Sequence, residues 1–215
     1  IARLNKSCYT YPMSFPRKLP IGVQSFKVLR ESHYLYADKT DYLFRLVQSG
    51  RVYFLSRPRR FGKSLFLSTL AAYFLGQKEL FSGLTIERLE HAESGKKELW
   101  QRYPVLYLDF NAKAYTNEQA LIDILNAHLR DWEEAFSLER REESPDGRLK
   151  DLIQRIYEKT GKQVVILVDE YDKPLLETMH DDPELNEIYR KILKGFYGVI
   201  KSSDEYLRFA FLTGV

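Results

Sequence analysis

The residues best suited to chemistry form one short stretch, residues 57–64, which reads Arg-Pro-Arg-Arg-Phe-Gly-Lys-Ser. Apolar runs lie on both sides of it, which is the pattern of a buried strand, a tight loop and the start of a helix. Gly-Lys-Ser at such a junction is the second half of the phosphate-binding motif G-x-x-x-x-G-K-[ST]. We therefore expect Gly62 to let the backbone approach a phosphate, Lys63 to reach the β- and γ-phosphates, and Ser64 to ligate Mg²⁺.

This loop departs from the motif at its first glycine. Arg57 stands at that position and Pro58 follows it, so the loop lacks one residue that tolerates positive φ and gains one with fixed φ. Arg59 and Arg60 have three open interpretations: they neutralise phosphate oxygens, they contact a partner subunit, or they contact nucleic acid. The residues that we expect to contact the nucleotide are Arg59, Arg60, Phe61, Gly62, Lys63, Ser64 and Leu65.

A second candidate group follows the most apolar run of the chain, residues 164–168. Asp169 and Glu170 come directly after this run, at the carboxyl end of a predicted mid-sheet strand, where open α/β sheets bind ligands. An aspartate there is suited to hold Mg²⁺, usually through water, because Mg²⁺ prefers oxygen ligands and keeps part of its hydration. The neighbouring glutamate is suited to accept a proton from the water that attacks the γ-phosphate. Together the two segments predict a nucleotide site.

Other polar residues have structural as well as functional interpretations. Asp38, Lys39 and Thr40 are either the start of a capped helix with a solvated lysine or a group close to the nucleotide. Asp172 either caps a helix or orients Glu170 or a water molecule. The four histidines lack the spacing of a metal site, and we interpret the fifteen tyrosines as half-buried packing rather than as platforms for stacking bases.

The rest of the chain supplies the elements that must position these groups. Strands are predicted at 34–37, 52–56, 105–110, 164–168 and 207–212, and helices at 25–32, 38–50, 63–76, 117–136, 146–160 and from residue 182 onward. Strands that alternate with helices predict a parallel sheet in an α/β fold. Residues 1–20, which contain three prolines and no periodicity, are predicted to be an extended arm on a domain of residues 21–215.

Composition limits the class of protein. The 215 residues suffice for one α/β domain, and 44% hydrophobic with 29% charged residues is ordinary for a soluble globular chain. A net charge of +3 does not by itself indicate nucleic-acid binding. The single cysteine, Cys8, cannot form an internal disulfide, and neither a membrane helix nor a signal peptide is visible, so we expect a cytoplasmic protein. Because it begins at Ile1 and stops at Val215 after a strand-like run, we expect a fragment.

Several stretches together resemble the bacterial AAA-ATPase-like family over about residues 18–215. They are Leu-Pro-Ile-Gly at 19–22, Tyr-Ala-Asp-Lys-Thr at 36–40, the Ser-Arg-Pro-Arg-Arg-Phe-Gly-Lys-Ser loop at 56–64 and Val-Asp-Glu-Tyr-Asp-Lys-Pro at 168–174. The resemblance implies a P-loop NTPase fold, a three-layer sandwich with a mainly parallel sheet and an additional strand between the loop strand and the acidic strand. By this analogy 207–212 is the inserted strand and Thr213 is the polar residue that senses the γ-phosphate. The next strand is absent, so the domain is predicted to be truncated after Thr213.

The sequence therefore predicts a Mg²⁺-dependent P-loop ATPase domain. Its catalytic residues would be Lys63, Glu170 and Thr213, with Ser64 and Asp169 holding the metal and ATP as substrate. The family often carries a PD-(D/E)XK nuclease-like domain, so a fused domain or a homo-oligomer is the expected partner, and no nuclease activity is expected of this chain. A binding module for nucleic acid or protein, with nucleotide as a switch or not at all, is the alternative. A kinase is a third, which the water-activating Glu170 disfavours.

Overall fold

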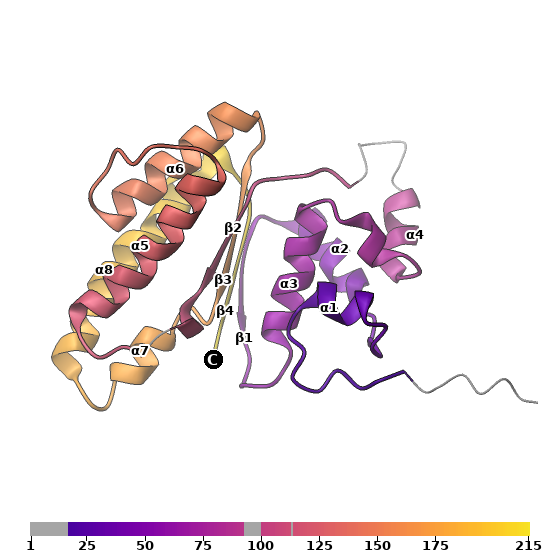
Figure 1. Cartoon of the computed structure of the whole chain (residues 1–215), viewed down its shortest axis with the longest axis horizontal. Coiled ribbons are helices and arrows are strands. Elements are labelled where there is room, and N and C mark those ends of the chain that lie inside the picture. Colours follow the sequence, from indigo (N-terminus) through magenta and orange to yellow (C-terminus); the bar gives the residue numbers. More distant parts are fainter. Residues whose placement is uncertain (1–16, 93–99, 113) are drawn as a thin grey trace, which may run out of the picture.

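The computed structural model describes residues 17–92, 100–112 and 114–215 (Figure 1). The predicted arm lies outside the described residues up to residue 16, and residues 17–20 have no regular secondary structure. With η denoting a 3₁₀ helix, the elements are α1 (Phe26–Glu31), α2 (Thr40–Ser49), β1 (Val52–Ser56), α3 (Lys63–Phe74), η1 (Lys78–Phe81), α4 (Thr85–Ala92), β2 (Val105–Asp109), η2 (Phe110–Ala112), α5 (Glu118–Ala135), α6 (Pro145–Thr160), β3 (Val164–Asp169), α7 (Lys173–Thr178), α8 (Pro183–Ser202), η3 (Asp204–Tyr206) and β4 (Leu207–Gly214).

Four strands of the described residues form one parallel sheet, in the order β1-β4-β3-β2. The predicted parallel sheet is confirmed, and β4 lies between β1 and β3, as the resemblance implied for residues 207–212. Ser56 at the end of β1 pairs with Gly214, and Asp109 at the end of β2 pairs with Asp169. The carboxyl ends of all four strands therefore meet at one edge of the sheet.

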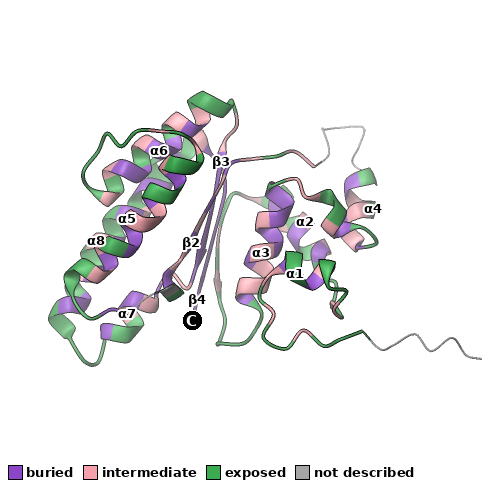
Figure 2. Ribbon diagram, in the orientation of Figure 1, coloured by how far each residue is buried: buried purple, intermediate pink, exposed green. Residues whose placement is uncertain are grey.

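Helices cover both faces of the sheet, which gives the predicted three layers (Figure 1). All six residues of β3 are buried, as Figure 2 shows. Ile166 and Val168 pack in a core with α5, α6 and α8, whereas Val165 and Leu167 pack in the core that contains α1, α2 and α3. Because helices cover both faces of β3, successive side chains of this strand are buried in two different cores, which explains its continuous apolar run.

Local signals in the sequence account for the ends of several helices. The side chains of Ser25, Asn117, Ser144 and Asp182 accept hydrogen bonds from amides in the first turns of α1, α5, α6 and α8. The last turn of α6 is followed by Gly161 with φ of 66°, a left-handed conformation that glycine adopts readily. These predicted helix starts and stops are confirmed.

One prediction for the N-terminal half is wrong, and one helix there was not predicted. Residues 34–37 are not a strand, because Tyr34 and Leu35 donate their backbone hydrogen bonds to Leu29 and to Lys18, in non-strand segments. Helix α4, in a stretch without a clear prediction, is set by tertiary contact: its first residues donate their amide hydrogens to the side chains of Asp38 and Thr40.

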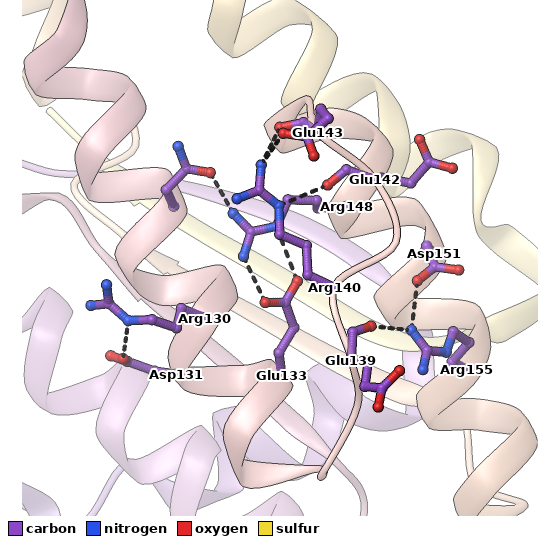
Figure 3. A network of polar contacts seen from close by, with 11 residues as sticks. Arg130, Asp131, Glu133, Glu139, Arg140, Glu142, Glu143, Arg148, Asp151 and Arg155 are labelled. Carbon is purple, nitrogen blue, oxygen red and sulfur yellow. Dashed lines mark hydrogen bonds and ion pairs between the residues drawn. The ribbon is translucent and has the colours of Figure 1, made fainter.

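A polar network ties α5 to α6 on the outer layer of the molecule (Figure 3). The Arg148 guanidinium, only 4% exposed, donates two hydrogen bonds to the carboxylate of Glu133, at 3.0 and 2.7 Å, and a third to Asn126. The two parallel hydrogen bonds pair the guanidinium with the carboxylate, so neither buried charge is left without a partner.

Candidate functional site

The predicted phosphate loop connects β1 to α3 and is anchored to the neighbouring strand. The Arg57 amide donates to the carbonyl oxygen of Gly214 at 3.2 Å, so the loop begins against the end of β4. Gly62 has φ of 76°, and no atom lies within 4 Å of where its Cβ would be. The position therefore favours glycine because of its backbone conformation and not because space is lacking. Arg60 has φ of 68°, which is strained for a residue with a side chain.

The N-terminus of α3 has the properties of an anion site. Its N-cap residue is Gly62, and no side chain accepts a hydrogen bond at the cap. The first amides of a helix have no intrahelical acceptor and carry the positive end of the helix dipole. A phosphate placed there would therefore accept hydrogen bonds from the backbone.

Lys63 is buried inside the loop rather than extended into solvent. Its Nζ donates to the carbonyl oxygens of Arg57 at 2.8 Å and Pro58 at 3.3 Å. An ammonium group has three donors, so one remains for a ligand in this arrangement. Ser64 follows in the first turn of α3 and is half-buried.

The two acids lie at the same edge of the sheet, tied to β4 by Thr213. The hydroxyl of Thr213 donates to Oδ1 of Asp169 at 2.6 Å and accepts a hydrogen bond from the amide of Glu170 at 3.2 Å. Asp169 is 3% exposed and Thr213 is fully buried. The single hydroxyl hydrogen of Thr213 is thus used to hold the Asp169 carboxylate, and its predicted role as a γ-phosphate sensor stays a prediction.

Backbone strain occurs in both halves of the site. Glu170 has φ of 52°, and it and Arg60 are two of five described non-glycine residues with positive φ. Such conformations cost about 1–3 kcal/mol each and are found preferentially at functional sites. In this protein one follows β1 and the other follows β3.

The loop and the acids are therefore brought together across β4. Arg57 contacts Gly214, and the preceding residue, Thr213, contacts Asp169 and Glu170. Tyr171 also donates its amide hydrogen to the carbonyl of Thr213 at 2.8 Å. The resemblance implied the place of β4 between β1 and β3, whereas the hydrogen bonds that Thr213 and Gly214 form are seen only in the folded chain.

Gly214 is a residue of the candidate site that the sequence analysis did not identify. A Cβ there would lie 2.5 Å from Cε1 of Tyr171 and 2.7 Å from Oδ1 of Asp172. Asp172 accepts the Val215 amide through Oδ2 at 2.9 Å, while Oδ1 is buried without a hydrogen-bond partner among the described residues. Its side chain makes no cap bond to α7, so simple capping does not explain this residue. A glycine two residues after the predicted strand at 207–212 was the available signal.

Asp38 has a well-defined structural role. Its Oδ1 accepts hydrogen bonds from the amide and the hydroxyl of Thr40, at 2.9 and 2.7 Å, and its Oδ2 accepts the Thr85 amide at 2.7 Å. Desolvation opposes ionisation, but these hydrogen bonds prevail and lower the pKa of Asp38. The carboxylate thus supports the start of α2, whose N-cap position belongs to Lys39, and joins it to α4.

A cavity of about 600 Å³ opens beside the phosphate loop. Its lining is largely aromatic and aliphatic, and it includes Gly62 and Lys63 of the loop itself. Large apolar side chains at its wall stay exposed, with Tyr42 at 59% and Phe61 at 69%. The sequence analysis did not identify this cavity, because α2 and α3 form it only when packed together.

The charges around the site differ in how they are paired. Arg59 and Arg60 are exposed and form no ion pair or side-chain hydrogen bond with a described residue. Lys173, by contrast, donates to Asn111 at 3.1 Å and lies 3.6 Å from Glu177.

The described residues contain no cluster of three or more His, Cys, Asp or Glu that could hold a metal ion. The four histidines are thus not brought together as a metal site within that part of the chain. Mg²⁺ needs no such cluster, because it retains water ligands and uses one or two protein oxygens. The second oxygen of Asp169 accepts no hydrogen bond within the described chain, and the Ser64 hydroxyl is the same kind of hard oxygen ligand. In the same ranges, none of the helices combines the length and apolarity needed to cross a bilayer.

Comparison with known proteins places the chain in a family. The model of a family described as "Predicted AAA-ATPase" matches residues 20–215. An uncharacterized protein in the vnfD 5′ region of Azotobacter chroococcum mcd 1 is 40% identical over 200 residues. That alignment covers 93% of this chain but 37% of the relative, so the chain spans little more than a third of that protein. No solved structure matches the chain.

Proposed function

Since the chain belongs to the AAA-ATPase-like family of predicted AAA-ATPases, we propose that it binds ATP with Mg²⁺ and hydrolyses it at the carboxyl edge of the sheet. One observation supports the proposal most. The uncapped N-terminus of α3 and the Asp169–Glu170 pair lie at one edge, joined through Gly214 and Thr213. This shared edge supports the proposal, because a bound triphosphate would need both the helix N-terminus and the acidic pair.

Each residue has a role that follows from its position. The first amides of α3 and the ammonium of Lys63 would hold the phosphates, and Asp169 and the Ser64 hydroxyl would supply oxygen ligands for Mg²⁺. The bound ion would neutralise charge on the phosphate oxygens. Glu170 would orient and deprotonate the attacking water, and Thr213 would keep the Asp169 carboxylate directed. Hydrolysis by this class is mainly positioning and charge neutralisation, so an arginine from a second copy would raise the rate about 10³–10⁵-fold.

The test separates binding from hydrolysis. Calorimetry with Mg·ATP is expected to show that Lys63→Ala loses binding, whereas Lys191→Ala, a change at an exposed lysine on α8, leaves it unchanged. Glu170→Gln is expected to bind ATP normally and to release phosphate about 10²–10⁴-fold more slowly, the usual contribution of a general base. Wild-type affinity in the Lys63 variant, or wild-type turnover in the Glu170 variant, would refute the proposal.

A second candidate is a binding module for nucleic acid or a partner protein. The exposed Arg59 and Arg60, which have no acidic partner in the described chain, favour it. A phosphate-release assay with and without DNA distinguishes the two. Binding of DNA without ATP and without phosphate release would support the module and contradict the ATPase.

A further inference from the structure

We infer that Asp172 is a positioning residue for the hydrolytic step: its buried carboxylate holds the turn that carries Glu170 against the end of β4. The inference rests on the proposed function, because it assumes that Glu170 acts on the attacking water. Neither helix capping nor phosphate binding explains Asp172, since its side chain makes no cap bond to α7 and lies beyond the loop and the acidic pair.

The carboxylate of Asp172 is not placed where it favours stability. The residue is 9% exposed, and Oδ1 is buried without a hydrogen-bond partner among the described residues. No ion pair between described residues involves it. A buried charge without a cationic partner is unfavourable, and a buried polar atom left unpaired in a native fold calls for a functional explanation.

Three hydrogen bonds join the acidic turn to the end of β4, and Asp172 supplies the last of them. The amides of Glu170 and Tyr171 donate to the side-chain and main-chain oxygens of Thr213, at 3.2 and 2.8 Å. Oδ2 of Asp172 then accepts the amide hydrogen of Val215 at 2.9 Å. Three successive residues of the turn are thus tied to the last residues of the chain, so the turn is fixed along its length and not at one point.

The same carboxylate packs directly on the main chain of Gly214. A Cβ at Gly214 would lie 2.7 Å from Oδ1 and 2.8 Å from Cγ of Asp172. The carbonyl oxygen of Gly214 accepts the amide hydrogen of Arg57 at 3.2 Å. The Asp172 clamp, defined by its contacts with Gly214 and Val215, therefore lies one residue away from the start of the phosphate loop as well as beside the acidic turn.

The clamp matters because the backbone of Glu170 is strained. A φ of 52° is unfavourable for a residue with a side chain and persists only where the surrounding structure holds it. The clamp lies two residues from Glu170, in a turn closed by the hydrogen bond from the Lys173 amide to the Glu170 carbonyl at 3.0 Å. Without the clamp we expect the turn to relax and the Glu170 carboxylate to move. A displacement of about 1 Å can cost about 10²-fold in rate.

The turn remains anchored on its other side when the Asp172 side chain is changed. The hydroxyl of Tyr197, on α8, donates to the carbonyl oxygen of Tyr171 at 3.2 Å. The main-chain carbonyl of Asp172 accepts the amides of Leu175 and Leu176, at 3.0 Å each, at the start of α7. A side-chain substitution leaves these bonds in place, so it tests positioning and not folding.

The experiment compares Asp172→Ala, which removes the carboxylate, with Asp172→Asn, which keeps an oxygen for the Val215 amide. At saturating Mg·ATP, phosphate release by the alanine variant is expected to fall about 10–100-fold, whereas the asparagine variant should stay close to the wild type. Calorimetry should give both variants the wild-type affinity for Mg·ATP. Ser144→Ala, which removes the cap of α6, is the control: it should lower Tm by about 2–4 °C and change neither quantity.

Hydrogen exchange measures the clamp without any nucleotide. In the Asp172→Ala protein the amides of Glu170 and Tyr171 are expected to exchange at least about tenfold faster than in the wild type, because local opening of the turn becomes easier. In the Asp172→Asn protein their exchange should be unchanged.

The outcomes separate this inference from the proposed function. Wild-type phosphate release or unchanged exchange in the alanine variant would overturn the clamp and leave the ATPase intact. An asparagine variant as slow as the alanine variant would also overturn it, because the charge and not the hydrogen bond would then matter. A loss of Mg·ATP affinity as large as the loss of rate would show that Asp172 acts on binding. If the wild-type protein releases no phosphate, the proposed function fails, and a role in hydrolysis fails with it, however fast the amides exchange.

Discussion

Replacing Thr213 by valine tests the contact on which the site's geometry depends. Valine has nearly the same shape as threonine but no hydroxyl, so the change removes the 2.6 Å hydrogen bond to Asp169 without opening a cavity. It also removes the acceptor of the Glu170 amide. Thr213 is fully buried and Asp169 beside it is 3% exposed, so water cannot easily replace either lost hydrogen bond.

The expected loss of stability follows from these two bonds. A hydrogen bond to a charged group contributes about 1.5–3 kcal/mol, and a neutral one about 0.5–1.5 kcal/mol. We therefore expect Thr213→Val to lower the free energy of unfolding by about 3 kcal/mol. For a domain of this size each kcal/mol lowers Tm by roughly 2–4 °C, so Tm should fall by about 6–12 °C.

The assay is urea denaturation followed by circular dichroism, with a thermal melt of the same samples. Thr213→Ser is the matched control, because it keeps the hydroxyl and loses one buried methyl group, for a loss of about 1 kcal/mol. A valine variant as stable as the serine variant would show that the hydroxyl does not hold Asp169, and the reasoning about β4 would be wrong.

Two further predictions concern stability. Arg148→Met leaves the Glu133 carboxylate, which is 12% exposed, without its partner (Figure 3), and should lower the free energy of unfolding by about 3–5 kcal/mol. The Arg148→Met/Glu133→Leu double variant should recover most of that loss, because it removes both charges. Urea denaturation that finds the single variant as stable as the wild type would contradict the pairing. Burial raises the pKa of Tyr36 to about 12, above the unfolded value of about 10, so its contribution to stability is complete below pH 10 and is lost as pH rises from 10 through 12. An alkaline titration followed by tyrosinate absorbance should therefore show that some tyrosines ionise only above about pH 10, with unfolding as the pH rises further. Ionisation of every tyrosine near about pH 10 in the folded protein would refute this.

The sequence alone determined most of the fold because its signals are local. The apolar run at 164–168 is long enough to be buried on both faces, and β3 is buried throughout. Capping residues such as Ser144 and Asp182 lie directly at helix starts, and Gly161 lies directly at a helix end. A helix terminus depends on a few neighbouring residues, so a reader of the sequence can locate it.

Only the tertiary structure decided how the candidate site is assembled. Thr213, Asp169 and the loop are distant in sequence. The resemblance implied that β4 lies between β1 and β3, but the hydrogen bonds from Thr213 to Asp169 and from Glu170 to Thr213 follow only from the folded chain. The same holds for the cavity, whose wall comes from α2, α3 and the irregular segment before α2. Residues 34–37 have the side chains of a strand, yet no strand lies beside them, because pairing is a property of two segments and not of one. Contacts between distant segments leave no local pattern. The sequence therefore predicts which residues are candidates for the site, and the packing of the chain determines where they lie.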